Sequence, residues 1–506
     1  MGLSVGLVAG STGIVLAQAA SNLAPSTFQP DNRSSTSRVT VARDPGAETP
    51  PGSENLFVTI GKVTLQDGLP QMAEANARFI ASLQGKRVPA SEIFRATRTL
   101  EQDYADAGFV LARVVLPQQT VVDNGPLRIV VIDGFIENVN TSAVPGPVRR
   151  RVEQLTDPLI GRRPLRLQEI ERRLLLAGDT YGTRLSSTLS PGTATGATQL
   201  TLEGQYKRWT GSYGIDNVLS DQLGPGNLSA GLELNGALEM GETFYGRIGG
   251  SPTRFFGSDP QYRILAAGTV FPIGLDGLTF NLEATSSQSN PDDALVPTNS
   301  SFDRFSVRFY YPWIRSRAFN LTSQLMFDRV SDEQNVVAPT GDIPLYKDEL
   351  SVLRASVDGN WAFDRGSFLQ SSLILSKGLD AFGASSTSAG SSIPLSRQGA
   401  DPQFTKLVLG FRYDHPLNNE FSMTVRGRLQ ENFGDVMPTS EQFNVAGVSE
   451  LSTFDAGSVK GDDGWVLRAE VAYRSQTNFG QLPVVIKPYL FGAYARLGFE
   501  QPTIFE

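Results

Sequence analysis

The chain of 506 residues has no cysteine and a single histidine, His415. Without cysteine there can be no disulfide, no thiolate metal ligand and no thiol nucleophile. One imidazole cannot form a histidine metal cluster, and no catalytic triad can be assembled around His415, which we interpret as a structural or solvated residue. We therefore predict that the protein is not an enzyme and that it uses no metal and no cofactor.

The chain also lacks an excess of positive charge and, beyond its N-terminus, any long apolar run. Its 44 Lys and Arg residues are outnumbered by 52 Asp and Glu residues, and the resulting net charge of -8 argues against a nucleic-acid partner. After the N-terminus no run reaches the roughly 18 apolar residues that a membrane-spanning helix needs. If the chain crosses a membrane, it must therefore do so with strands.

Residues 1–20 are predicted to be a secretory signal peptide, because an apolar and small-residue run ends in Ala17-Gln18-Ala19, an A-x-A cleavage pattern. The positively charged start of such a signal is missing, so we expect the natural start to lie upstream. A single membrane anchor is the alternative interpretation. Residues 21–55 are rich in Pro, Ser, Thr and Gly without apolar periodicity, and they are predicted to form a flexible linker.

Two segments of similar pattern follow, residues 56–134 and 135–207. In the first, an alternating strand pattern is followed by two stretches with apolar residues at helical spacing and then by two further strand patterns. The second segment repeats this β-α-α-β-β order. A small sheet that is covered by helices on one face keeps an unpaired edge, and such an edge can bind an extended peptide by strand addition.

Three short motifs occur in these segments: NGPLRIVVIDG at residues 124–134, RPLRLQEIERRLLL at 163–176, and LSPG at 189–192, followed by Gly196. They resemble patterns in the POTRA domains of the ShlB/FhaC (TpsB) transporters of two-partner secretion, relatives of the BamA insertases. The resemblance implies two periplasmic POTRA domains that bind an unfolded substrate. The alternative is that these domains only fold and space the domain that follows.

From Trp209 onward the sequence alternates between apolar and polar residues. Phe305 and Phe309, for example, alternate with Arg304 and Arg308. Strands are predicted at residues 209–218, 228–236, 242–252, 261–273, 278–286, 302–315, 319–330, 348–363, 366–379, 404–417, 421–434, 465–475 and 484–497. Their connections are alternately short and long, as in an outer-membrane barrel with tight periplasmic turns, long external loops, an apolar lipid-facing band and a polar lumen. We expect the inward arginines to line a wet pore.

The predicted fold class is mainly β, with two α+β POTRA domains, residues 56–134 and 135–207, followed by a transmembrane antiparallel β-barrel over residues 208–506. Barrels of single bacterial chains normally have an even number of strands. The family resemblance implies a barrel of about 16 strands. We therefore expect that the last strands are absent from this chain and that the barrel is C-terminally incomplete.

The stretch from Phe443 to Glu470 is predicted to be a Gly- and Asp-rich loop between two strands. It resembles the sixth external loop of the family, which folds back into the pore and carries the motif VRGF at its tip. With Phe454 aligned to this motif, Ser452 takes the place of its Arg, and Ala493 takes the place of the strand Asp with which that Arg pairs. Because both charges are replaced together, neither is stranded in the pore. We expect a loop that is held differently.

The candidate residues of this site form two groups. The pore-loop candidates are Gly447, Ser452, Phe454, Asp455, Lys460, Asp462 and Asp463. The barrel residues that are expected to face the loop are Ala493, Arg426 and Arg428. For the charged loop residues we favour a plain solvated loop, and contacts with lumen arginines are the alternative interpretation.

The resemblance implies an outer-membrane transporter that recognises and secretes a large partner exoprotein such as a hemolysin or adhesin, with activation of that partner as an optional further role. The POTRA domains would bind its unfolded N-terminal secretion segment, and the loop would leave or rearrange in the lumen. The expected partners are this exoprotein and outer-membrane lipids, and we expect a monomer. Two alternatives remain: a BamA-like assembly or insertion factor, and a passive porin, which would leave residues 56–206 without a purpose.

Overall fold

The computed structural model describes residues 19–30, 39–41, 49–217, 219–224, 226–292, 296–385, 393–480 and 482–502. The chain divides into two compact units. The sheet unit comprises Met1–Asp31 and Arg208–Glu506, and the α+β unit comprises Asn32–Lys207. Within the described residues, no helix combines the length and the apolar character that crossing a membrane requires.

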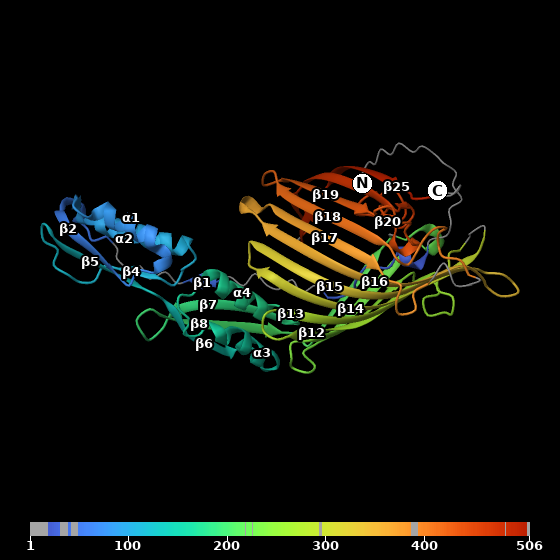
Figure 1. The fold of residues 1–506 in the computed structure, drawn as a ribbon, viewed down its shortest axis with the longest axis horizontal. Helices are drawn as coiled ribbons and strands as arrows, with labels where there is room; N and C mark the ends of the chain where they lie inside the picture. The colour runs from blue at the N-terminus through green and yellow to red at the C-terminus, as the bar shows by residue number, and fades with distance from the viewer. Residues whose placement is uncertain are drawn as a thin grey trace. The chain divides into compact units, whose positions relative to one another are not determined.

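The first half of the α+β unit is a four-stranded sheet with two helices on one face (Figure 1). Its elements are β2 (Phe57–Gln66), α1 (Ala73–Leu83), β3 (Arg87–Pro89), α2 (Ala90–Asp106), β4 (Arg113–Val115) and β5 (Gly125–Ile132). The strand order is β3-β2-β5-β4. Apolar residues at helical spacing, such as Phe79 and Leu100, pack on alternate residues of the central strands, such as Leu127 and Ile129. The core therefore fixes the two long strands, and the short strands β3 and β4 form the edges.

The second half of the α+β unit has a similar order, but no strand between its two helices corresponds to β3. Its elements are β6 (Phe135–Ala143), α3 (Gly146–Thr156), α4 (Leu167–Gly178), β7 (Thr183–Pro191) and β8 (Ala197–Tyr206). The sheet order is β1-β7-β8-β6. Its edge strand β1 (Val39–Val41) comes from the stretch predicted to be a linker, and it pairs in parallel with residues 187–189 of β7. Both halves thus contain the β-α-α-β-β order predicted from the sequence, and a segment of the linker extends the second sheet.

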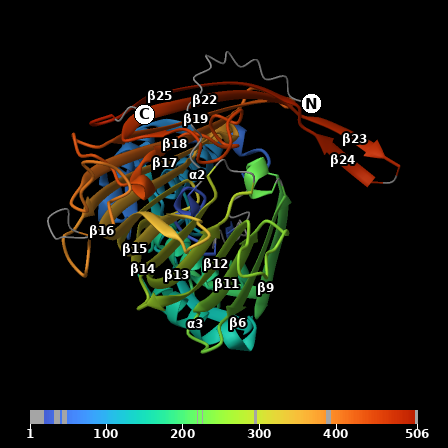
Figure 2. The ribbon, with the colours of Figure 1, turned by 90° about the vertical axis from the view of Figure 1, so that its right-hand side faces the viewer.

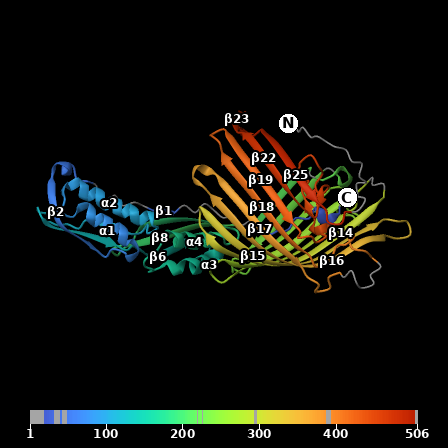
Figure 3. The same cartoon turned by 45° about the horizontal axis from the view of Figure 1, so that its top comes forward.

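The sheet unit is built on one antiparallel sheet of 13 strands, which curves strongly in Figure 2 and whose strands are seen from the side in Figure 3. Its strands, in sheet order, are β9 (Trp209–Asp216), β10 (Asn227–Asn235), β11 (Thr243–Gly250), β12 (Tyr262–Ile273), β13 (Leu278–Ser289), β14 (Thr298–Arg315), β15 (Phe319–Val336), β16 (Ile343–Ala362), β17 (Phe368–Gly378), β18 (Thr405–Pro416), β19 (Phe421–Glu431), β22 (Asp463–Tyr473) and β25 (Tyr489–Gly498). In the described part of the chain, β9 and β25 are the edges and do not pair with each other. Every strand overlaps a predicted one, and the mainly β fold class is confirmed.

The two faces of this sheet differ as the alternation predicts. Phe305 of β14 and Leu353 of β16 are 48% and 41% exposed, whereas Arg304 and Arg308 of β14 are 8% and 1% exposed. We call the face with the exposed apolar residues the outer face and the face with the buried polar residues the inner face. An apolar outer band with polar residues inside is the pattern of a strand-built membrane protein.

Short elements complete the sheet unit. β23 (Ser475–Phe479) and β24 (Leu482–Ile486) form a separate hairpin that projects from the sheet in Figure 2, and β20 (Phe443–Asn444) pairs with β21 (Lys460–Gly461). The 3-10 helices of the two units are η1 (Ala20–Asn22), η2 (Ser53–Asn55), η3 (Pro70–Met72), η4 (Asp157–Leu159), η5 (Asp221–Leu223), η6 (Asp364–Gly366) and η7 (Thr439–Glu441). Of the predicted signal peptide, only Ala19 and Ala20 lie within the described residues.

Candidate functional site

Residues 432–462, between β19 and β22, form a loop that we call the inner loop. Phe443 and Val445 of this loop are 2% and 0% exposed, and they belong to an apolar cluster with Val466 of β22. Val466 shares the inner face with Arg468, because side chains two residues apart on a strand point the same way. The inner loop therefore lies against the inner face.

Glu441 fastens the start of the inner loop to the sheet. Its carboxylate accepts hydrogen bonds from Arg354 of β16 at 2.6 and 3.0 Å and pairs with Lys406 of β18 at 2.7 Å. Arg354 also donates to Asp328 of β15 at 2.9 Å. Two basic and two acidic side chains thus form one buried network, and removing one member of such a network strands a charge.

The tip of the inner loop is held by two arginines of the sheet. Arg428 of β19 pairs with Glu450, with Nη2 and Oε2 2.6 Å apart, and also donates to the carbonyl oxygen of Asn444. Arg468 of β22 donates to the carbonyl oxygen of Glu450 at 2.8 Å and to Ser452 Oγ at 3.0 Å. The loop supplies the carboxylate and the sheet supplies the arginines, which reverses the Arg-on-loop, Asp-on-strand pair that the resemblance implies.

The surroundings of Arg468 explain how the predicted barrel residues take part. Ala493 of β25 is the direct partner of Arg468 in the antiparallel pairing. The guanidinium of Arg468 lies 3.6 Å from the ring centre of Phe491 and pairs with Glu470 at 2.6 Å. Arg426 pairs with the same Glu470 oxygen at 3.1 Å. The structure therefore places Arg428 in contact with the loop, Arg426 on the Glu470 that Arg468 also binds, and Ala493 opposite Arg468. The role of these barrel residues in holding the loop stays a prediction.

The end of the inner loop is held at Asp462, which is fully buried. Its carboxylate pairs with Arg397, in the connection between β17 and β18, and accepts hydrogen bonds from the N–H groups of Met437 at 3.3 Å and Glu500 at 2.9 Å. Asp462 thus contacts an arginine of another loop rather than one of the sheet. The interpretation of Asp462 as a solvated loop residue is wrong, because its side chain is fully buried and paired with Arg397.

The two other charged candidates at this end of the loop do not pair with lumen arginines. Lys460, in β21, has an electrostatic interaction with Asp332 of β15. Asp463 begins β22 and pairs with Gly498 in the strand ladder. Both residues are therefore placed by the β20–β21 hairpin and by the start of β22.

The remaining candidates surround a cavity of about 570 Å³ beside the loop tip. Gly447, Ser452, Phe454, Asp455 and Arg426 all line it. Gly447 has a φ of +143°, a conformation that side-chain-bearing residues rarely adopt, so the turn at the tip depends on glycine. The cavity shows that the loop tip leaves room on the inner face next to the arginines that hold it.

A second segment, residues 19–30, also lies against the inner face, although the sequence assigns it to a signal peptide and a linker. Its main chain is bound by strand residues: Arg304 donates to Pro25 O at 2.8 Å and Arg308 to Ser26 O at 3.0 Å. Glu283 of β13 accepts a hydrogen bond from the N–H of Phe28 at 2.8 Å and pairs with both arginines. We call residues 19–30 the N-terminal segment.

These contacts overturn one expectation about the pore. Arg304, Arg308 and Arg468 do not line a wet pore, because the N-terminal segment and the inner loop cover them and each has hydrogen-bond partners. Sequence reasoning also missed Glu441 and Glu450 as the acidic residues that hold the loop. The only sequence signal for such contacts is a charged residue at an inward position of a strand, and it does not name the loop residue opposite.

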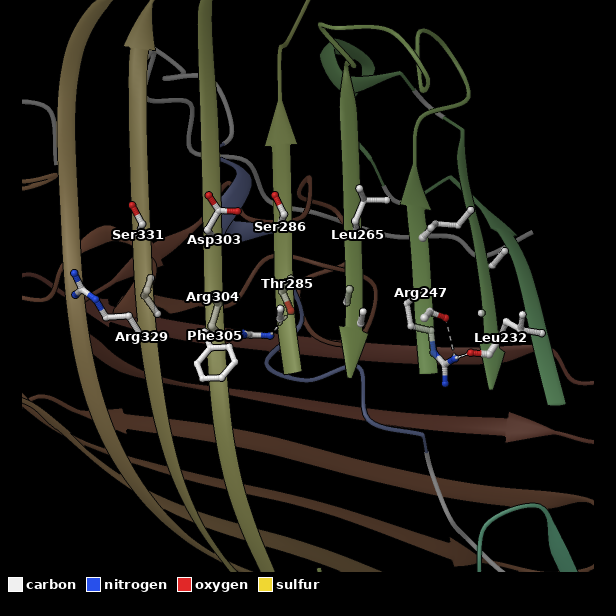
Figure 4. Close-up of a pocket in the computed structure, with 18 of the residues that line it drawn as sticks. Leu232, Arg247, Leu265, Thr285, Ser286, Asp303, Arg304, Phe305, Arg329 and Ser331 are labelled. Atoms are coloured by element: carbon white, nitrogen blue, oxygen red, sulfur yellow. Dashed lines mark hydrogen bonds between the residues drawn. The ribbon is translucent and has the colours of Figure 1, made fainter. Parts of the chain in front are cut away.

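The outer face carries a groove of about 780 Å³ across β10 to β16 (Figure 4). Leu232, Leu265 and Phe305 give it apolar walls, and Figure 4 shows Asp303 and Ser331 in one row on neighbouring strands. None of the predicted site residues lines this groove. The groove is thus separate from the loop site, on the face with the apolar band.

The outward apolar band, the polar inner face with two segments fastened to it, and the two preceding β-α-α-β-β domains together define an outer-membrane transporter with POTRA domains. The comparison with protein families gives the particular family. The sequence pattern of the haemolysin secretion/activation protein ShlB/FhaC/HecB family matches residues 196–492, and that of the ShlB-type POTRA domain matches residues 58–134. The chain belongs to the ShlB/FhaC/HecB family, the outer-membrane transporters of two-partner secretion.

Curated relatives agree at low identity. The heme/hemopexin transporter protein HuxB of Haemophilus influenzae (strain 86-028NP) is 20% identical over 405 residues, covering 78% of this chain and 68% of HuxB. The hemolysin transporter protein ShlB of Serratia marcescens is 24% identical over 444 residues, covering 84% of this chain and 73% of ShlB. The similarity thus includes the α+β unit as well as the sheet unit.

Solved structures show the same fold. CdiB from Escherichia coli has a TM-score of 0.66 at 20% identity, covering 87% of this chain and 79% of that chain. CdiB from Acinetobacter baumannii has a TM-score of 0.59 at 12% identity, covering 92% of this chain and 86% of that chain. At these identities the likeness establishes the fold, and the residue contacts must come from this chain itself.

Proposed function

We propose that this transporter recognises and exports one large exoprotein, and that it does so without an enzymatic step. The observation that carries the proposal is that two segments of the chain lie across the inner face, where apolar packing and polar contacts with strand side chains hold them without pairing in the strand ladder. Glu441 and Glu450 hold the inner loop, and Glu283 holds the N-terminal segment. Breaking these contacts exchanges ion pairs without disturbing the strand ladder, so the path along the inner face can open while the sheet stays intact.

We propose that the exoprotein is first bound as an extended chain by the α+β unit. The pairing of β1 with β7 shows that this edge accepts a short extended segment in parallel. Only residues 187–189 of the nine-residue β7 pair with β1. A longer client segment therefore gains more main-chain hydrogen bonds than β1 provides, at about 0.5–1.5 kcal/mol each.

A disulfide tests this binding edge, because the chain has no cysteine of its own. Thr40 and Thr188 are paired positions in β1 and β7. In the variant Thr40→Cys with Thr188→Cys, oxidation should lock β1 in place, abolish binding of the unfolded secretion segment and lower export, and reduction should restore both. Binding is measured by calorimetry on the α+β unit and export is measured in cells with the full chain.

The matched control places a disulfide elsewhere in the same unit. Thr59 and Arg87 are paired positions in β2 and β3. The variant Thr59→Cys with Arg87→Cys should bind and export equally well when oxidised and reduced. If the β1–β7 lock leaves binding and export unchanged, the exoprotein does not enter at this edge.

The alternative of a BamA-like assembly factor is disfavoured by the family match over residues 196–492. Reconstitution distinguishes the two. Proteoliposomes that carry this chain should translocate the exoprotein and should not accelerate membrane insertion of an unrelated barrel protein. Accelerated insertion without translocation would favour the assembly factor.

A further inference from the structure

Two aspartates face each other on the inner face of the sheet. Asp332 of β15 and Asp348 of β16 are direct partners in the antiparallel pairing, and both are 0% exposed. Side chains at directly opposite positions have Cβ atoms about 5 Å apart. Two ionised carboxylates at this spacing repel each other, and each has lost its hydration, so the pair requires a positively charged partner.

Most oxygen atoms of this pair lack a well-formed hydrogen bond. Asp348 Oδ1 accepts a hydrogen bond from the N–H of Ser396 at 2.9 Å, whereas Asp348 Oδ2 and both Asp332 oxygens make no well-formed hydrogen bond and have no contact with solvent. The hydroxyl groups of Ser21 and Tyr346 lie close to the Asp332 carboxylate. Directed hydrogen bonds normally satisfy buried carboxylate oxygens. Three unsatisfied oxygens in one place therefore indicate a ligand that accepts electron pairs.

Two buried hydroxyl groups lie beside the same carboxylate. Tyr346 of β16 is 8% exposed and interacts with Asp332, and Ser21 of the N-terminal segment is 9% exposed and also lies beside Asp332. Neither hydroxyl oxygen has a well-formed hydrogen bond of its own. The cluster thus gathers carboxylate and hydroxyl oxygens from three separate parts of the chain.

Lys460 is the cationic side chain that faces Asp332 from the inner loop. Its single positive charge balances one carboxylate and leaves the second uncompensated. A divalent cation at the aspartates would balance both charges and displace Lys460. Lys460 of the inner loop and a small cation would therefore compete for the same carboxylates.

We propose that Asp332 and Asp348 bind Ca²⁺, with the hydroxyl oxygens of Tyr346 and Ser21 as further ligands. Ca²⁺ takes oxygen ligands in flexible geometry. Among the described residues no group of three or more His, Asp or Glu side chains could hold a metal, so the proposed site has two carboxylates only and depends on hydroxyl oxygens for further ligands. A site with this few charged ligands is in the weak class of extracellular calcium sites, with a Kd of about 0.1–1 mM.

Occupancy of this site changes both inner segments. The cation ties Ser21, and with it the N-terminal segment, to β15 and β16. It also displaces Lys460, which loosens the β21 end of the inner loop. External calcium would thus set which inner segment is the more firmly held, which goes beyond the proposed export step.

Terbium luminescence tests the site, because Tb³⁺ replaces Ca²⁺ and is sensitised by a neighbouring tyrosine. In the full-length protein in detergent, Tb³⁺ should give sensitised emission that millimolar Ca²⁺ removes, and Ca²⁺ should raise the Tm. Asp332→Asn and Asp348→Asn should each lower Tb³⁺ affinity at least tenfold and abolish the Tm shift. Tyr346→Phe should lose the emission and keep a smaller Tm shift, because one hydroxyl ligand is gone and both carboxylates remain.

Two further variants make the outcome decisive. Lys460→Gln should bind Tb³⁺ more tightly than the parent protein, because the competing ammonium is gone. Asp358→Asn, on the inner face of the same strand β16, should leave affinity unchanged. Unaltered Tb³⁺ affinity in Asp332→Asn, or a parent protein whose Tm does not respond to Ca²⁺, would overturn the proposal and leave a shared proton as the partner of the pair. Neither result depends on export, so failure here and failure of the proposed function are distinguishable.

Discussion

The α+β unit and the inner face of the sheet unit bury different kinds of side chain. In the α+β unit the fully buried side chains include Leu127, Ile129 and Leu200, whose burial stabilises by removing apolar area from water. On the inner face, Arg308 and Asp462 are buried to the same degree and depend on charged partners. Apolar burial is not directional, whereas a buried ion pair penalises the loss of either partner. The first arrangement suits a domain that stays folded, and the second suits segments that must be released.

The largest expected effect comes from the network at the start of the inner loop. Glu441→Gln should leave Arg354 and Lys406 with only Asp328 as an acidic partner, at a cost of about 3–5 kcal/mol. The loop should detach, and the single-channel conductance in planar bilayers should rise.

The control for this change is Glu420→Gln, since Glu420 is exposed in the turn between β18 and β19. Its conductance and Tm should equal those of the parent protein. Equal conductance of Glu441→Gln and the parent protein would mean that the inner loop does not obstruct the pore.

The matching change in the α+β unit should act on folding alone. Ile129→Ala removes a fully buried side chain from the first sheet and should lower the free energy of unfolding by about 2–5 kcal/mol. Urea unfolding of the α+β unit measures this loss. Val122→Ala, at a position that is 56% exposed, is the control and should cost far less. A rise in channel conductance in Ile129→Ala would mean that the core of the α+β unit also affects the pore.

A smaller effect is expected where the loop tip meets β22 and β25. Ser452→Arg should place a second guanidinium beside Arg468 and destabilise the tip. Adding Ala493→Asp, opposite Arg468, should recover part of this loss, with a coupling free energy of about 0.5–3 kcal/mol. Thermal unfolding of the parent, both single variants and the double variant gives this coupling. Strictly additive effects would mean that positions 452 and 493 do not interact through Arg468.

The smallest effect concerns an exposed carboxylate of the α+β unit. Hydrogen bonds that Thr193 donates to Glu137 hold the pKa of this carboxyl below its ordinary value of 4.5. Since the folded pKa is the lower one, the stabilisation is present above the ordinary pKa and is lost as the pH falls through the folded value. NMR titration should show the lowered pKa, and Thr193→Val should return it towards 4.5. An unchanged pKa in Thr193→Val would assign the shift to another cause.

The strands were predictable because alternation records which face is buried. Arg304 is buried and the next residue, Phe305, is exposed, as the alternation of polar and apolar residues along β14 predicts. The sequence did not predict the end of β15 and the start of β16, which adjoin the connection between these two strands. Residues 331–335 are all polar, so no apolar alternation marks the end of β15. The pairing of that run with residues 343–349 is set by the hairpin and not by a local pattern.

The contacts of the candidate site were less predictable than its location. Ser452, Arg426 and Arg428 were expected at the loop tip, where the structure places them. The partner of Arg428 could not be predicted from the sequence, because the loop contains several acidic residues and only the folded geometry selects Glu450. Strand β1 was missed for a similar reason: three residues carry too little periodicity, and their partner β7 lies far along the chain. The functional roles of all these residues stay predictions.

The burial of the Glu441 network also fixes how the molecule responds to ionic strength. Arg254 and Asp292 form an exposed pair, with side chains 45% and 47% exposed, and dissolved salt screens such pairs. The side chains of Arg354 and Glu441 are only 15% and 4% exposed, so mobile ions have little access to the space between them. Screening by dissolved salt therefore does not detach the start of the inner loop, whose release requires a group that enters the interior and competes for the charges there.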